Sequence, residues 1–71
     1  MITYTKATKK NLRFLYNSER GNLYFRRPGK KKVYEVCEGF SYDELYQAMC
    51  AGECELIWIE GPSLGTNVEV D

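Results

Sequence analysis

Hydrophobic and polar residues alternate along several short segments, which is the pattern of strands that bury one face. The alternation is clearest in residues 12–17 and 23–27, where Leu, Phe and Tyr occupy every second position. A similar segment runs from about Lys32 to Glu38, Ile2–Thr5 is a short β-like stretch, and residues 55–60 are strongly apolar. The chain is therefore expected to form five short strands, of which the first is the least marked.

Two turn signals separate the strand segments. Residues 17–22 read Asn-Ser-Glu-Arg-Gly-Asn, a polar sequence with the glycine that is typical of a hairpin loop. Pro28-Gly29 is a second signal, because Pro suits the first central position of a β-turn and Gly tolerates positive φ at the next. Both signals favour hairpins between neighbouring strands.

One segment has helical rather than strand periodicity. Ser41 is a good N-cap, and Glu44 three residues later completes a capping-box pattern. Gly52 is placed to end the helix. The apolar residues of the segment share one face, and they are Tyr42, Leu45, Ala48 and Met49. The sequence thus predicts an amphipathic helix over Ser41–Ala51.

These elements predict an α+β fold in the order β-β-β-β-α-β. The expected architecture is a small antiparallel or mixed β-sheet of about four to five strands, with one amphipathic helix on one face. Residues 1–61 form the single domain, and residues 62–71 form a polar C-terminal tail in which Thr66–Val70 is an alternative short edge strand. The helix connection is long enough for a parallel crossover, and an antiparallel placement is equally compatible with it.

One helix covers only one face of such a sheet, and alternation along each strand assigns its residues to one face or the other. The helix-covered face receives Leu12, Phe14, Tyr16, Leu23, Phe25, Tyr34, Val36, Ile57 and Ile59. The other face receives Arg13, Leu15, Tyr24, Arg26, Val33, Glu35, Leu56 and Trp58. Contiguous exposed apolar surface usually marks a binding site. The alternatives are that the tail or the first strand covers this face, or that a homodimer joins two such faces.

Charge is strongly segregated along the chain. All ten Lys and Arg residues lie in residues 1–32 with Glu19 as the only acid, so this segment carries +9. Residues 33–71 hold the other nine acids and no base, so they carry −9. The net charge is zero, and the asymmetry points to charged partners and to two opposite electrostatic poles.

Little in the sequence favours catalysis. The chain has no histidine, and Gly29-Lys30-Lys31-Lys32 lacks the upstream glycine and the Ser/Thr of a phosphate-binding loop. Three cysteines, Cys37, Cys50 and Cys54, are an odd number, which favours free thiols in a reducing compartment over a disulfide framework. A Cys50–Cys54 disulfide is the alternative, and it closes only a tiny loop. We expect no enzyme activity, no cofactor and no metal site.

Two features bear on location. No run of residues is long and apolar enough for a membrane span, and residues 1–10 do not have the pattern of a signal peptide. The expected location is the cytoplasm, or the host cytoplasm if the protein is encoded by a phage.

The function predicted from these features is that of a non-enzymatic, stoichiometric binding protein. Its expected partner is a protein or nucleoprotein complex that handles nucleic acid, such as a polymerase or a CRISPR-type defence complex. The class-level analogy is with inhibitors encoded by phages or mobile elements. The residues expected to bind the partner are Arg13, Tyr24, Arg26, Arg27, Lys30, Lys31, Lys32 and Trp58.

Two alternatives use the same residues differently. Basic strands interleaved with aromatic residues suit direct binding of nucleic acid. A sequence pI of 6.2 argues against it, because nucleic-acid-binding domains often lie above about 9. The other alternative is a structural or assembly subunit whose apolar face is buried in a homo-oligomer.

Overall fold

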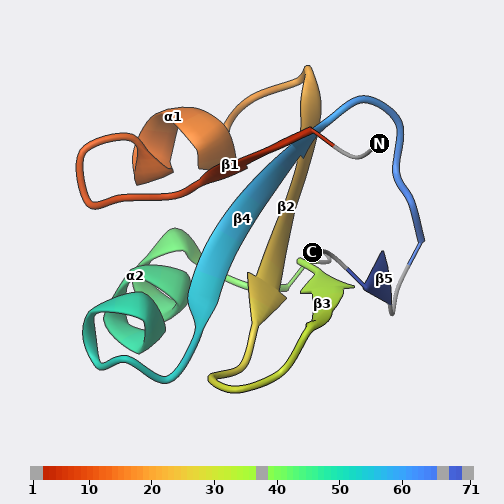
Figure 1. The fold of residues 1–71 in the computed structure, drawn as a ribbon. Helices are drawn as coiled ribbons and strands as arrows, with labels where there is room; N and C mark the ends of the chain where they lie inside the picture. Colours follow the sequence, from red (N-terminus) through yellow and green to blue (C-terminus); the bar gives the residue numbers. More distant parts are fainter. Residues whose placement is uncertain (1–2, 37–38, 66–67, 70–71) are drawn as a thin grey trace.

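The computed structural model describes residues 3–36, 39–65 and 68–69. Its elements in chain order are β1 (Tyr4–Lys6), α1 (Leu12–Tyr16), β2 (Gly21–Arg26), β3 (Lys32–Glu35), α2 (Tyr42–Cys50), β4 (Glu55–Glu60) and β5 (Val68–Glu69). The strands form one five-stranded antiparallel sheet in the order β1-β4-β2-β3-β5 (Figure 1). The predicted α+β class is confirmed, but the element order β-α-β-β-α-β-β differs from the predicted one.

The difference arises at residues 12–17, where the predicted strand is wrong and the chain forms α1 instead. Leu12 and Leu15 are three residues apart, so they share one face of a helix, and both are buried. In a strand they would point to opposite faces. The alternation of Leu12, Phe14 and Tyr16 therefore predicts the wrong element, and the helical spacing of Leu12 and Leu15 predicts the right one.

Two polar residues before α1 help to set its start. The backbone N–H of Thr8 donates to Asn11 Oδ1 at 2.6 Å, and the N–H of Asn11 donates to Thr8 Oγ1 at 3.4 Å. The N–H of Leu12 donates to the carbonyl oxygen of Thr8 at 2.9 Å. The bonds that Thr8 accepts give partners to the N–H groups of Asn11 and Leu12, which a helix N-terminus otherwise leaves without partners.

Helix α2 has the ends that the sequence predicts. Ser41 Oγ accepts a hydrogen bond from the backbone N–H of Glu44 at 3.2 Å, as an N-cap should. At the other end Gly52 has φ 75°, and its N–H donates to the carbonyl oxygen of Met49 at 3.1 Å. Glycine favours this left-handed conformation, so it ends the helix at little cost.

Strand β4 lies inside the sheet, between β1 and β2. Because β2 is antiparallel to both β3 and β4, those two strands run in the same direction, and α2 is the crossover between them. Strands β1 and β2 are likewise parallel, with β4 between them and α1 as their connection. The parallel alternative for the long connection is therefore the one that the structure adopts.

The register of β2 against β4 decides which residues share a face. Leu23 lies opposite Trp58, and Tyr24 lies opposite Ile57. Directly opposed residues point to the same side of a sheet, so Trp58 shares a face with Leu23 rather than with Tyr24. The predicted grouping of Tyr24 with Trp58 is wrong, because alternation within one strand does not fix its register against another.

Both helices cover one face of the sheet. Leu12 and Leu15 of α1 and Leu45 of α2 belong to the same buried cluster as Leu23, Leu56 and Trp58. The opposite face is also buried: Tyr24, Val33, Ile57 and Ile59 form a second cluster, against which Val68 of β5 packs.

The C-terminal segment closes this second face. After β4 the chain passes along the β3 side of the sheet and reaches β5 (Figure 1). The N–H of Leu64 donates to the Tyr24 hydroxyl at 3.0 Å, and Ser63 Oγ donates to Glu35 Oε1 at 2.7 Å. The alternative in which the tail covers the face is thus the observed one. Of the proposed edge strand over residues 66–70, Val68 and Glu69 form β5, and the other three lie outside the described residues.

Gly21 is required by the close approach of β2 to Trp58. A Cβ at this position would lie 2.7 Å from Trp58 Cζ2 and would collide with the carbonyl oxygen of Ile59. We expect Gly21→Ala to lower the free energy of unfolding by about 2 kcal/mol, because backbone and indole must move apart. At Gly29, with φ 76°, an added Cβ meets no atom within 4 Å. Gly29→Ala is therefore expected to lower the free energy of unfolding by only about 1 kcal/mol, because its positive φ is the only source of strain. Urea denaturation compares the two, and equal stabilities of Gly21→Ala and the wild type would contradict the packing.

The hydrogen bond from Leu64 to Tyr24 gives a test of the tail. Tyr24→Phe removes the acceptor of the Leu64 N–H, and we expect a loss of about 1 kcal/mol in unfolding free energy. Amide exchange at Leu64 should become faster. Tyr34→Phe is the matched control, because no described hydrogen bond involves that hydroxyl, and it should change stability by less than about 0.5 kcal/mol. Equal effects of both variants would argue against a tail held by Tyr24.

Candidate functional site

The predicted exposed aromatic face does not exist, because both of its anchors are buried. Tyr24 is 0% exposed and Trp58 is 9% exposed. Trp58 packs under the helices, while Tyr24 lies under the C-terminal segment on the opposite side of the sheet. Neither ring lies on an open sheet face, so the prediction that Tyr24 and Trp58 anchor a partner there is wrong.

Arg13 is exposed, but it lies apart from the other predicted basic residues. Its Cζ lies 4.9 Å from the ring centroid of Tyr42, so it links α1 to α2. Tyr42 also contacts Tyr16 edge-on and stacks on Tyr46, with centroids 5.7 and 5.9 Å apart. Helix α1 and the turn between β2 and β3 lie at opposite ends of the molecule in Figure 1. Arg13 therefore serves packing between the helices and not the same surface as the turn.

The remaining predicted residues do come together. Arg26 ends β2, Lys32 begins β3, and the tight turn between them carries Arg27, Lys30 and Lys31. We call residues 26–32 the basic turn. The N–H of Lys30 donates to the carbonyl oxygen of Arg27 at 3.1 Å, which closes the turn that Pro28-Gly29 predicts. Residues 27–32 are all exposed, so this turn places a dense positive charge at the end of the hairpin.

An aromatic group supports the basic turn. Phe25 and Tyr34 are cross-strand neighbours whose rings stack with centroids 5.4 Å apart. The guanidinium carbon of Arg27 lies 5.8 Å from the Phe25 centroid and 5.7 Å from the Tyr34 centroid. Phe40 lies 6.1 Å from Phe25 and extends the group. Cation–π contacts of this kind hold a guanidinium in place while its N–H groups stay available.

A hollow of about 600 Å³ lies beside the basic turn, between it, the end of α2 and the start of β4. We call it the basic hollow, and its charged walls are Lys6, Arg26, Arg27, Lys30 and Glu55. Sequence reasoning missed Lys6, because it comes from β1 and reaches the hollow only through the pairing of β1 with β4.

Among the residues that the structure describes, Glu55 is the one carboxylate in the lining of the basic hollow. Its Oε2 lies 2.6 Å from Arg26 Nη2, and its Oε1 lies 3.2 Å from Lys6 Nζ. The hydrogen bond from Arg26, and then that from Lys6, lowers the pKa of Glu55 below its ordinary value. Within the described ranges, Arg27 and Lys30–Lys32 form no ion pair, so their charge remains available to a partner.

The two halves of the chain do not form two separate charged ends. Strand β4 from the acidic half lies between β1 and β2 of the basic half, and Glu55 is the cross-strand partner of Arg26. Glu69 of β5 likewise lies opposite Lys32. The prediction of two opposite poles is wrong, because sheet pairing interleaves the halves and brings Glu55 against Lys6 and Arg26.

A second, smaller hollow lies on the α2 side of Arg27. Its volume is about 260 Å³, and its apolar walls include Phe25, Phe40, Leu45 and Ala48. Glu44 and Glu53 also line it. The Arg27 side chain therefore lies between two different hollows. The basic hollow is lined mainly by cations, and the second hollow is apolar and bordered by two carboxylates.

The described cysteines are Cys50, which is exposed, and Cys54, which is half-buried, and both are free thiols. Burial, followed by the charge of Glu53, raises the pKa of Cys54, so this thiol is protonated at neutral pH and is a weak nucleophile. Cys37 lies outside the described residues.

Two further findings concern the described part of the chain. No three His, Cys, Asp or Glu residues there are grouped so as to hold a metal ion. No helix there is long and apolar enough to cross a membrane. The basic turn and the basic hollow are suited to binding anions through their guanidinium and ammonium groups.

Comparison with known proteins adds no relative. No family model, curated protein or solved structure matches the chain.

The ion pairs of Glu55 make stability depend on pH in a defined direction. Because the folded-state pKa lies below the ordinary value of 4.5, the pairs stabilise the fold above that pH. This contribution is lost as the pH falls through the lower, folded-state value. Glu55 is partly exposed, so we expect Glu55→Gln to cost only about 0.5 kcal/mol at pH 7.

Urea denaturation of wild type and Glu55→Gln at neutral and acidic pH measures this dependence. Well below pH 4.5 the two proteins should have equal stability, because both then carry a neutral side chain at position 55. A stability difference that persists unchanged in acid would contradict the assignment.

Proposed function

We propose that this protein is a non-enzymatic binding protein that docks through its basic turn on an acidic surface of a protein or nucleoprotein complex that handles nucleic acid. The observation that carries the proposal is the group of cations Arg27, Lys30, Lys31 and Lys32, which form no ion pair with any described residue and are exposed on one tight turn beside the basic hollow. A hairpin turn closed by the hydrogen bond from Lys30 to Arg27 presents these charges with little loss of backbone entropy on binding.

The shape of the charged surface favours a protein partner over bare nucleic acid. The basic turn is bordered by Glu44 and Glu53 on the α2 side and by Glu69 opposite Lys32. A phosphate backbone that extended beyond the turn would approach these carboxylates, which opposes binding along a strand. An acidic protein patch of limited size meets the cations and avoids the carboxylates, since complementary charge sets both orientation and on-rate.

The proposed site replaces part of the set predicted from sequence. It keeps Arg26, Arg27 and Lys30–Lys32, adds Lys6, and leaves out Arg13, Tyr24 and Trp58. Stoichiometric inhibition by occlusion, as by phage- or mobile-element-encoded blockers, is the mode of action that we propose, with free thiols fitting a cytoplasmic setting. The aromatic group under Arg27 supports a second candidate, direct binding of single-stranded nucleic acid by stacking.

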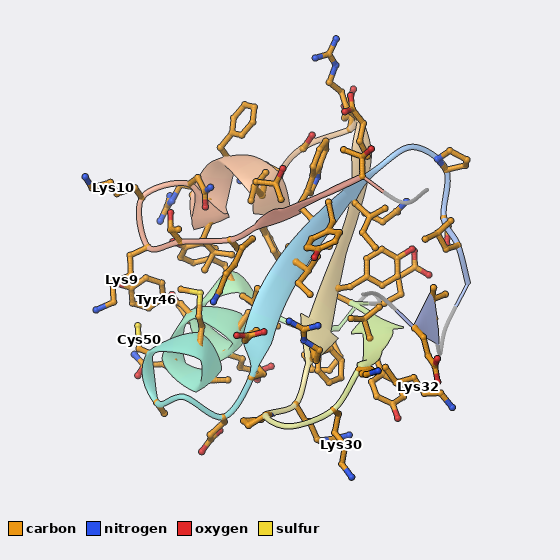
Figure 2. The ribbon with its side chains drawn as sticks, viewed as in Figure 1. Lys9, Lys10, Lys30, Lys32, Tyr46 and Cys50 are labelled. Carbon is orange, nitrogen blue, oxygen red and sulfur yellow. The ribbon has the colours of Figure 1, made fainter. Side chains whose placement is uncertain are left out.

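Two matched pairs of lysines test the proposal. Lys30 and Lys32 belong to the basic turn, whereas Lys9 and Lys10 lie before α1, away from that turn (Figure 2). Lys30→Glu/Lys32→Glu and Lys9→Glu/Lys10→Glu change the net charge equally. Fluorescence anisotropy with a labelled glutamate-rich peptide and a labelled single-stranded oligonucleotide gives the affinities of each variant.

We expect the wild type to bind the peptide more tightly than the oligonucleotide. The Lys30/Lys32 reversal should weaken peptide binding at least about tenfold, and the Lys9/Lys10 reversal should weaken it less than about threefold. Tighter binding of the oligonucleotide, with a steep salt dependence, would instead support the second candidate. Equal losses in both variants would show attraction by overall charge and would reject the basic turn as a specific site.

A further inference from the structure

Phe14 is the most exposed large hydrophobic side chain in the described part of the molecule. It is 72% exposed, whereas the others with high exposure, Tyr4, Phe40 and Leu64, are each 41% exposed. Helix α1 turns Leu12 and Leu15 into the core and leaves Phe14 pointing outward. Since Phe14 contributes little to the core, folding does not account for an aromatic ring here.

A hollow of about 390 Å³ lies directly beside Phe14. Leu15 and Trp58 form part of its wall, and Phe14 itself stands at its side. An apolar cavity of about 150 Å³ is large enough to bind benzene, so this hollow has room for a phenyl ring. The same small surface therefore carries both a protruding ring and a space that accepts one.

Two opposite charges also line this hollow, Arg20 and Glu60. Both residues are exposed, and among the described residues neither forms an ion pair. Their backbones are held in place, because Gly61 N–H donates to the carbonyl oxygen of Arg20 at 3.0 Å and Gly21 is the cross-strand partner of Glu60. The surface thus carries one positive and one negative side chain on held backbone positions, next to the ring and the hollow.

A surface that holds a ring, a hollow for a ring and one charge of each sign is complementary to itself. In a two-fold dimer each residue i that contacts j is matched by j contacting i, so the ring, the hollow and the two charges of such a surface each have a counterpart on a second copy. We infer that this surface joins two copies of the chain. Phe14 of each copy enters the hollow of the other, and Arg20 of each copy faces Glu60 of the other.

This dimer differs from one built on an open sheet face, since both sheet faces are buried within one chain. It also leaves the basic turn free, because α1 and that turn lie at opposite ends of the molecule (Figure 1). The inference is therefore independent of the proposed function. If both hold, a dimer presents two basic turns and gains avidity for a repeated partner surface.

Sedimentation equilibrium over concentrations from about 1 μM to about 1 mM tests the inference. The wild type should show a reversible monomer–dimer equilibrium. Phe14→Ala should raise the dimer dissociation constant at least about tenfold. Phe40→Ala is the matched control, since it removes an exposed phenyl ring elsewhere, and it should leave the constant unchanged. Circular dichroism of each variant verifies that it is folded.

The two charges allow a reciprocal test. Arg20→Glu and Glu60→Arg should each weaken the dimer, because each places like charges opposite one another. The double variant Arg20→Glu/Glu60→Arg restores opposite charges across the interface, so its dissociation constant should return to within about threefold of the wild-type value.

Three results would overturn the inference. They are a wild-type monomer at the highest concentration, a dimer that Phe14→Ala does not weaken, and a double charge exchange that fails to recover dimerisation. A wild-type monomer would leave the Phe14 surface to a different partner. It would not affect the basic turn, whose own test uses peptide binding.

Discussion

The pairing of β4 with β2 determines most of what this small protein presents to solvent. Six consecutive residue pairs join the two strands, from Gly21 opposite Glu60 to Arg26 opposite Glu55. This register places Leu23 and Trp58 under the helices and places Tyr24 and Ile57 on the opposite face. A shift of one residue would reverse these assignments, since successive side chains of a strand point to opposite faces. The tight contact of Gly21 with Trp58 fixes the register at one end.

The same pairing redistributes charge. A sequence divided into a +9 and a −9 segment would suggest a molecule with two poles. Because β4 lies between two strands of the basic half, Glu55 instead meets Lys6 and Arg26 in the sheet. Among the described residues, charges without an ion pair form local patches, such as Arg27 and Lys30–Lys32 of the basic turn, Glu44 and Glu53 near α2, and Arg20 and Glu60 beside Phe14. Recognition by this protein is therefore expected to depend on short patches and not on an overall dipole.

Local sequence signals predicted the parts of the fold that depend on local physics. The N-cap Ser41 and the stop at Gly52 bound α2, residues 55–60 form a strand, and Pro28-Gly29 makes the turn that carries the lysines. The predictions that are wrong all concern features that depend on contacts between distant parts of the chain. Residues 12–17 have both a strand-like alternation and a helical Leu12–Leu15 pair, and only packing against Trp58 and Leu23 decides between them. Burial of Tyr24 depends on a tail forty residues away. Lys6 reaches the basic hollow only because β1 pairs with β4. Phe14 is exposed because residues 12–16 form α1 and not the predicted strand.

The solvent exposure of Trp58 in the native protein is the most direct test of the register between β2 and β4. Trp58 is the only tryptophan in the chain. Its fluorescence therefore reports on one side chain without mutation. Acrylamide quenching of the native protein should be weak, with emission at short wavelength, and both should change to the values of a free indole in concentrated urea. Strong quenching and long-wavelength emission under native conditions would place the indole in solvent, and would contradict the register on which the sheet, the basic hollow and the Phe14 surface depend.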